Sequence, residues 1–183
     1  MQARRPWAAE ILHVWFHLLG PDDWFRGGAK VDALLRRRFA GEWHALRHRP
    51  ACEFLADPLT ARAAVLLFDQ GPRNLFRDDP RAFASDPLAR TIAIAALERG
   101  WDHALDLPGR QFLAMPLMHS ERIADQRRSL LIFTAMGDAN ILSFARSHHA
   151  MIARFGRFPH RNAVLGRRST ADEKAAIEAG NSW

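Results

Sequence analysis

Arginine and histidine side chains gather near the end of this chain. Between Ala139 and Ala171 there is no aspartate or glutamate, whereas the same stretch contains six arginines and three histidines. A guanidinium group binds carboxylates and phosphates through two parallel hydrogen bonds, and an imidazole can act as a general acid or base near neutral pH. The stretch therefore predicts a negatively charged partner, which is either a carboxylate from elsewhere in the fold or a bound anionic ligand.

Four polar side chains fall on helical stripes that are otherwise apolar, when the sequence is wound at about 100° per residue. They are Gln70, His119, Gln126 and His148. A buried polar group without a partner costs about 1–3 kcal/mol, so we expect each of the four to form hydrogen bonds. One interpretation is a core network that fixes helix packing. The other is a polar pocket lined by these four residues, with arginines at its mouth.

Helix signals recur along the chain and strand alternation does not. We expect helices over residues 7–19, 30–48, 57–70, 87–99, 116–136 and 138–155, and a short last helix that begins near residue 171. Asp57, Asp138 and Thr170 are typical N-caps, and Pro116 is interpreted as the start of the fifth helix. The stripes place Leu18 and Leu59 on buried faces. The pattern predicts an all-α domain spanning residues 1–183, with about seven helices in antiparallel pairs.

Composition excludes several classes of function. The net charge is +6, but arginines and acids alternate before residue 139, so we do not expect nucleic-acid binding. No apolar run approaches the ~20 residues of a membrane-spanning helix. Cys52 is the only cysteine, which excludes an internal disulfide and favours the cytoplasm. No cofactor motif and no complete set of metal ligands is present, so we expect neither a cofactor nor a metal. The oligomeric state stays open.

Several long motifs resemble the bacterial family DUF924. They are Leu67–Arg77 (LFDQGPRNLFR), Ala82–Ala89 (AFASDPLA), Pro116–Glu121 (PLMHSE), Arg154–Asn162 (RFGRFPHRN) and Leu165–Thr170 (LGRRST). The resemblance covers nearly the whole chain and implies a tetratricopeptide-like, right-handed array of helices, but it supplies no reaction. One departure is Gly71, where the family pattern tends to have an apolar residue.

Two functions follow from these residues. The first is a binding module for an anionic small molecule, or for a peptide or protein that presents carboxylates. Its candidate ligand-binding residues are Gln70, Arg73, Asn74, His119, Glu121, Gln126, His148, Arg157, His160, Arg161, Asn162 and Arg167. The second is a cofactor-independent hydrolase or isomerase. It would use His119 or His148 as general acid or base and Asp69 or Asp125 to orient the imidazole.

The acids around the fifth predicted helix also have two interpretations. Glu121, Asp125 and Arg128 have the spacing of an ion-pair ladder along one helix. Alternatively, these acids bind the C-terminal arginines. The two interpretations differ in whether the arginines remain available to a ligand.

Overall fold

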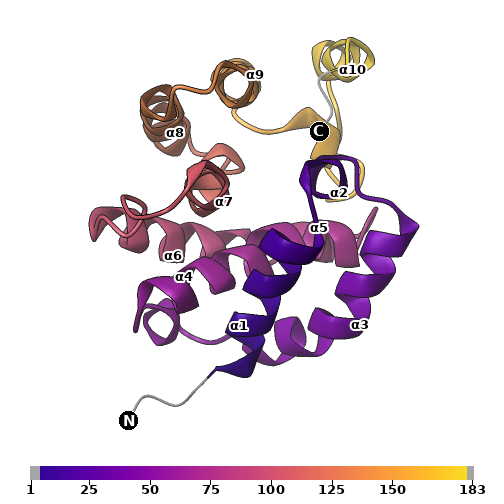
Figure 1. The fold of residues 1–183 in the computed structure, drawn as a ribbon. Coiled ribbons are helices and arrows are strands. Elements are labelled where there is room, and N and C mark those ends of the chain that lie inside the picture. Colours follow the sequence, from indigo (N-terminus) through magenta and orange to yellow (C-terminus); the bar gives the residue numbers. More distant parts are fainter. Residues whose placement is uncertain (1–4, 181–183) are drawn as a thin grey trace. The chain divides into compact units, whose positions relative to one another are not determined.

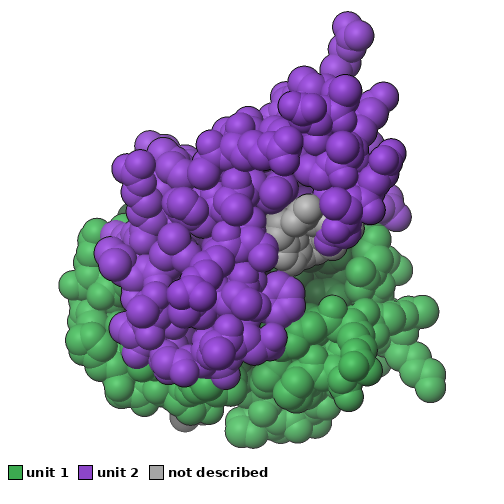
Figure 2. All heavy atoms as spheres, turned by 90° about the horizontal axis from the view of Figure 1, so that it is seen from above, with its two compact units in different colours: residues 1–77, 81–116 green, residues 78–80, 117–183 purple. Residues whose placement is uncertain are grey.

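A computed structural model describes residues 5–180, which are helices and loops without a strand (Figure 1). The chain divides into two compact units (Figure 2). Unit 1 comprises Met1–Arg77 and Arg81–Pro116, and unit 2 comprises Asp78–Pro80 and Leu117–Trp183. The all-α class is confirmed, whereas the single domain expected from the chain length stays a prediction.

Unit 1 contains the first six helices and most of the seventh. They are α1 (Pro6–His13), α2 (Pro21–Phe25), α3 (Ala29–Leu46), α4 (Pro58–Val65), α5 (Gly71–Leu75), α6 (Asp86–Glu98) and α7 (Leu107–Met118). A short 3-10 turn lies at Ala51–Phe54, and another, Pro80–Phe83, begins at the last residue of the Asp78–Pro80 segment of unit 2 and continues in unit 1. Helix α4 begins as predicted, because the Asp57 carboxylate accepts a hydrogen bond from the Thr60 amide at 2.8 Å.

Aromatic rings fill the core of unit 1. Trp15 meets Phe112 edge to face with ring centroids 5.4 Å apart, and Phe54 meets Phe68 in the same way at 5.1 Å. The buried Trp43 indole donates to the Ser85 hydroxyl at 2.9 Å, so the polar edge of this ring is satisfied inside the core. Ring pairs of this geometry add to the free energy gained from burying apolar area.

Two helices of unit 1 end in a π-helical turn. Residues Val14–Leu18 follow α1, and residues Leu66–Gln70 follow α4. A π turn widens the helix and is often found at functional sites. The second turn buries all five of its side chains, including the polar pair Asp69 and Gln70.

Unit 2 contains the end of α7 and three further helices. They are α8 (Ile123–Met136), α9 (Ala139–Phe155) and α10 (Ala171–Glu178), with a 3-10 turn at Pro159–Arg161. The α8 and α9 helices pack side by side across the Gly137–Asp138 connection (Figure 1). As predicted, Asp138 caps α9 and Thr170 caps α10. Gly156 ends α9 with φ of 69°, a left-handed conformation that favours glycine.

Several sequence expectations are wrong. Pro116 lies inside α7, so the helix expected over 116–136 is two helices separated at residues 119–122. The third helix does not stop at Gln70, because α5 follows directly, and the structure has more helices than the expected seven. Leu18 and Leu59 are 53% and 58% exposed, although their stripes predicted burial.

Candidate functional site

The Arg73 guanidinium lies between two aspartates of unit 1. It donates to the Asp86 carboxylate through two hydrogen bonds of 3.0 Å and lies 3.3 Å from the buried Asp69 carboxylate. Burial alone would lower the pKa of Arg73, but the charges of Asp69 and Asp86 outweigh it and raise that pKa. Arg73 therefore joins the π turn after α4 to the start of α6.

Gln70 and Asn74 belong to the same part of unit 1. The Gln70 amide donates to the Asp69 carboxylate at 2.6 Å and lies 3.8 Å from the Met115 sulfur. The Asn74 amide donates to the Gln70 carbonyl at 3.1 Å. The structure thus brings Asp69, Gln70, Arg73 and Asn74 together, as one group within unit 1. A single pocket that also contains the histidines stays a prediction.

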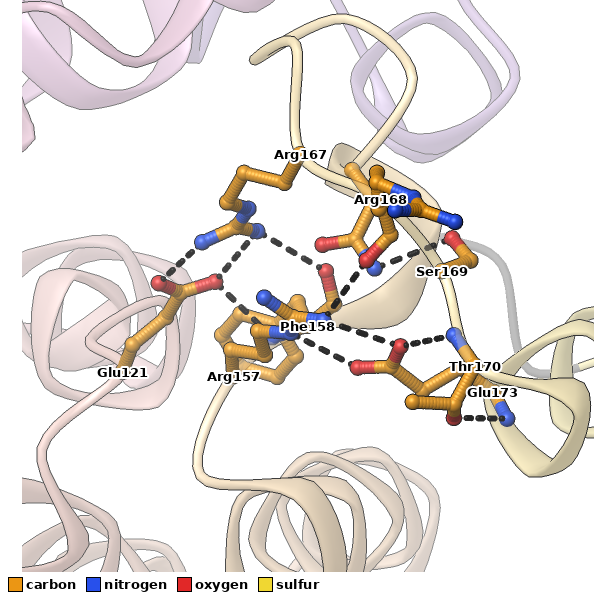
Figure 3. Close-up of polar contacts among 9 residues, drawn as sticks. Glu121, Arg157, Phe158, Arg167, Arg168, Ser169, Thr170 and Glu173 are labelled. Carbon is orange, nitrogen blue, oxygen red and sulfur yellow. Dashed lines mark hydrogen bonds and ion pairs between the residues drawn. The ribbon is translucent and has the colours of Figure 1, made fainter.

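In unit 2, Glu121 and Arg167 form a clamp on the Phe158 backbone (Figure 3). Both guanidinium NH2 groups donate to the Glu121 carboxylate, at 2.8 and 3.0 Å. Glu121 also accepts from the Phe158 amide at 2.8 Å, and Arg167 donates to the Phe158 carbonyl at 3.1 Å. Burial would raise the pKa of Glu121, but hydrogen bonds from Arg167 and Phe158 lower it overall.

A second ion pair holds α10. Arg157 donates to both oxygens of Glu173, at 2.7 and 3.0 Å, and to the Arg168 carbonyl at 2.9 Å (Figure 3). The Glu173 carboxylate also accepts from the Thr170 amide at 2.8 Å, which completes the capping box of α10. Hydrogen bonds from Arg157 and Thr170 lower the pKa of Glu173 to about 2.

Carboxylates of the chain itself therefore bind at least three of the four arginines that we expected to hold a ligand. Asp69 and Asp86 pair with Arg73, Glu173 pairs with Arg157, and Glu121 pairs with Arg167. The ladder predicted for α8 is wrong for Glu121, which precedes that helix and binds a C-terminal arginine instead.

Two histidines and the fourth arginine lie around the Phe158 ring, and a third histidine lies beside His148. The ring centroids of His148 and His160 lie 5.4 and 5.6 Å from that of Phe158, and the Arg161 guanidinium carbon lies 4.4 Å from it. The His119 and His148 centroids are 6.0 Å apart. We call His119, His148, His160 and Arg161 the histidine cluster. Three of its members, His119, His148 and Arg161, are nine-tenths or more buried, as is Phe158.

His148 is neutral at pH 7 in this environment. Its Nδ1 lies 2.8 Å from the Phe144 carbonyl, within the same helix. Burial and the nearby His119 lower the pKa of His148 from 6.5 to about 3, with smaller effects in the same direction from Arg161 and His160. The hydrogen bond to the Phe144 carbonyl opposes this shift. The three side chains that lower the pKa, those of His119, Arg161 and His160, are positively charged or can become so.

Gln126 ties the end of α7 to α8. Its amide donates to the carbonyls of Met118 and Ser120 at 2.6 and 2.7 Å. Its Oε1 and the Ser129 hydroxyl are buried, and neither has a hydrogen-bond partner in the part of the chain that the structure describes. These two atoms are acceptor and hydroxyl groups that a small polar ligand could satisfy.

Asp125 and Asn162 also have partners within unit 2. The Asp125 carboxylate accepts from the Ser120 hydroxyl at 2.6 Å. The Asn162 amide donates to the Ser169 hydroxyl at 3.1 Å, while its buried Oδ1 has no hydrogen-bond partner among residues 5–180. Asn162 thus connects the turn after Phe158 to the segment that leads into α10.

Two residues of this arrangement were not predicted from the sequence. Glu173 was not among the candidate residues, so its pairing with Arg157 was missed. Phe158 was noticed only within the motif RFGRFPHRN, although its ring contacts His148, His160 and Arg161. The sequence signal that could have identified Glu173 is its position directly after the stretch without acids, where a carboxylate is available to the arginines of that stretch.

The family model for DUF924, described as a bacterial protein of unknown function, matches residues 11–181. The chain belongs to this family. A solved structure, described as that of the protein of unknown function ATU0120 from Agrobacterium tumefaciens, is similar to this DUF924 chain at a TM-score of 0.88 and 38% identity. The match covers 94% of this chain and 97% of that one. No curated protein matches the chain.

Two searches of residues 5–180 complete the description of this DUF924 chain. None of the helices there is both long enough and apolar enough to cross a bilayer. Within the same residues, no three side chains of histidine, cysteine, aspartate or glutamate are grouped as metal ligands.

Proposed function

We propose that this DUF924 protein is a binding module for a small anionic ligand, and that the histidine cluster of unit 2 is its site. One observation carries the proposal: the His148 and His160 imidazoles and the Arg161 guanidinium lie around the buried Phe158 ring, and the His119 imidazole lies beside His148. Arg161 already interacts with the Glu121 carboxylate. Because each member of the cluster is a cation or can become one, a bound anion would be attracted by all four.

The chemistry of the cluster favours carboxylate or phosphate-like ligands. A guanidinium binds such groups through two parallel hydrogen bonds, and a protonated imidazole adds one charge-assisted hydrogen bond. A carboxylate side chain of a peptide or protein partner has the same chemistry.

Binding is better supported than catalysis. A general acid or base works best when its pKa lies near the working pH, whereas the pKa of His148 is about 3. Asp69 binds Arg73 and Gln70, and Asp125 binds the Ser120 hydroxyl, so both aspartates connect parts of the fold. A hydrolase or isomerase that uses His119 stays a prediction.

The proposal also includes a tetratricopeptide-like architecture and a cytoplasmic location. The packing of α4 against both α1 and α6, and of α8 against α9, supports a tetratricopeptide-like array of helix pairs. The cytoplasm, a peptide or protein partner, and the absence of nucleic-acid binding stay predictions.

A thermal-shift series tests the proposed site. Phosphate, sulfate, acetate and succinate are added to the wild type, with sodium chloride of equal ionic strength as the reference. A ligand present at 100 times its dissociation constant stabilises the folded protein by about 2.7 kcal/mol. We expect at least one anion to raise the melting temperature above the chloride reference.

Matched variants locate the response. Arg161→Gln should abolish it, and Arg154→Gln should not, because Arg154 is an exposed arginine of the same segment. If every anion acts like chloride, or if Arg161→Gln responds as strongly as the wild type, the histidine cluster is not the anion site.

A further inference from the structure

Three of the four members of the histidine cluster are buried, so a ligand can reach them only when a covering segment moves. His148 and Arg161 are each 6% exposed, and the Phe158 ring between them is fully buried. Polar side chains at this depth exchange ligands only when a covering segment opens. The covering segment should be the one with the smallest buried apolar area.

Helix α10 has that property. It has eight residues, and only Glu173 and Ala176 among them are buried. A helix of this length is not stable by itself in water, so α10 depends on its contacts with the rest of unit 2. By contrast, α9 buries Ile141, Met151 and Ile152.

Most of the polar attachment of α10 passes through one carboxylate. Glu173 accepts two hydrogen bonds from Arg157 and one from the Thr170 amide (Figure 3). Burial of Ala176 against Phe158 adds an apolar contact. Arg167, only three residues before Thr170, is bound to Glu121 instead, so the chain is anchored up to that point. The Arg168 carbonyl accepts from Arg157 and the Ser169 hydroxyl accepts from Asn162, so separation of α10 also requires these two hydrogen bonds to open.

The same contacts place α10 next to the site. Ala176 shares an apolar cluster with Phe158, Met151 and Ile152, and α10 also contacts the Pro159–Arg161 turn. The Phe158 ring in turn contacts His148 and Arg161. Separation of α10 would therefore uncover the ring and the turn around which the histidine cluster is built.

We infer that α10 is a lid on the histidine cluster, held closed by the Arg157–Glu173 ion pair and opened by its separation from Phe158. The importance of the opening rests on the proposed function, but the opening itself can be tested without any ligand. Glu173 and Arg157 act here as positioning residues, because neither belongs to the histidine cluster.

Carbethoxylation of histidines by diethyl pyrocarbonate measures this opening. The reagent modifies unprotonated, accessible imidazoles, and mass spectrometry resolves the rate at each residue. We compare the wild type with Glu173→Gln and Arg157→Gln, which break the ion pair from either side. Glu178→Gln is the control, because it makes the same charge change at an exposed position of the same helix. His103, whose side chain is 80% exposed, reports the intrinsic reactivity.

The lid predicts a local effect. In Glu173→Gln and Arg157→Gln, His148 should react about tenfold faster or more, the factor expected for the loss of charge-assisted hydrogen bonds. The amides of α10 should exchange with solvent faster, while those of α9 keep their wild-type rates. Glu178→Gln and the His103 rate should stay unchanged.

Other outcomes would overturn the inference. Faster exchange in α10 without faster labelling of His148 would mean that α10 does not cover the cluster. Equally faster amide exchange in α9 would mean that unit 2 opens as a whole. Unchanged amide exchange in α10 would mean that the Arg157–Glu173 ion pair does not hold the helix closed. Added sulfate separates the two proposals: if the variants open as predicted but sulfate never protects His148, the lid is supported and the anion site is wrong.

Discussion

Acidification should destabilise this protein through His148. Its pKa is about 3 in the folded chain and close to 6.5 when the chain is unfolded. Between these two values the unfolded chain binds a proton that the folded chain does not, so the free energy of unfolding must fall as the pH falls. The loss begins near pH 6.5 and is complete below about pH 3.

The magnitude follows from the same two pKa values. At about pH 5 the unfolded imidazole is almost fully protonated and the folded one is almost fully neutral. Lowering the pH from about 7 to about 5 should therefore remove about 2 kcal/mol from the free energy of unfolding. The physical cause is the burial of His148 beside His119 and Arg161, which disfavours the charged imidazole.

Urea unfolding followed by circular dichroism measures this effect. The wild type is compared with His148→Gln and with His149→Gln, a partly exposed histidine on the same helix. We expect His148→Gln to remove about 2 kcal/mol of pH dependence between pH 7 and pH 5, whereas His149→Gln keeps it. Parallel pH profiles for the wild type and His148→Gln would refute the reasoning.

Two further predictions concern the fold. Arg73→Gln should lower the free energy of unfolding by about 3 kcal/mol, because it leaves the buried Asp69 charge without its main cation; the exposed Arg99→Gln should change it little in the same urea titrations. Gly156→Ala should cost about 1 kcal/mol at its left-handed φ of 69°, whereas Gly41→Ala, inside α3 with open space around it, should stabilise the protein. Equal effects of the two alanine substitutions would contradict the second prediction.

Local signals in the sequence were sufficient for much of the fold. The caps at Asp57, Asp138 and Thr170 were correct because each acts within three residues of the helix start. Pro116 was wrongly interpreted as the start of a helix. A proline can also lie inside a helix, and Pro116 lies two residues before the end of α7. Leu59 was misplaced because α4 buries Thr60 and Ala61 instead.

The sequence predicted which side chains of the candidate site are buried, but it did not predict which residues form ion pairs with one another. His119, Gln126 and His148 are buried as the stripes indicated, because helical periodicity is a local property. The pairing of Arg167 with Glu121 joins residues 46 positions apart, and that of Arg157 with Glu173 joins residues 16 positions apart. Such pairings depend on how the helices pack, which a single sequence does not specify.

Proton uptake on anion binding tests the central claim most directly. Sulfate keeps its charge near neutral pH, so any proton taken up when it binds comes to the protein. Titration calorimetry in two buffers of different ionisation enthalpy counts these protons. An anion at the histidine cluster should raise the pKa of the neutral His148, which predicts saturable binding with proton uptake that His148→Gln abolishes. Sulfate binding with the same proton count in the wild type and His148→Gln, or no saturable binding, would contradict the account.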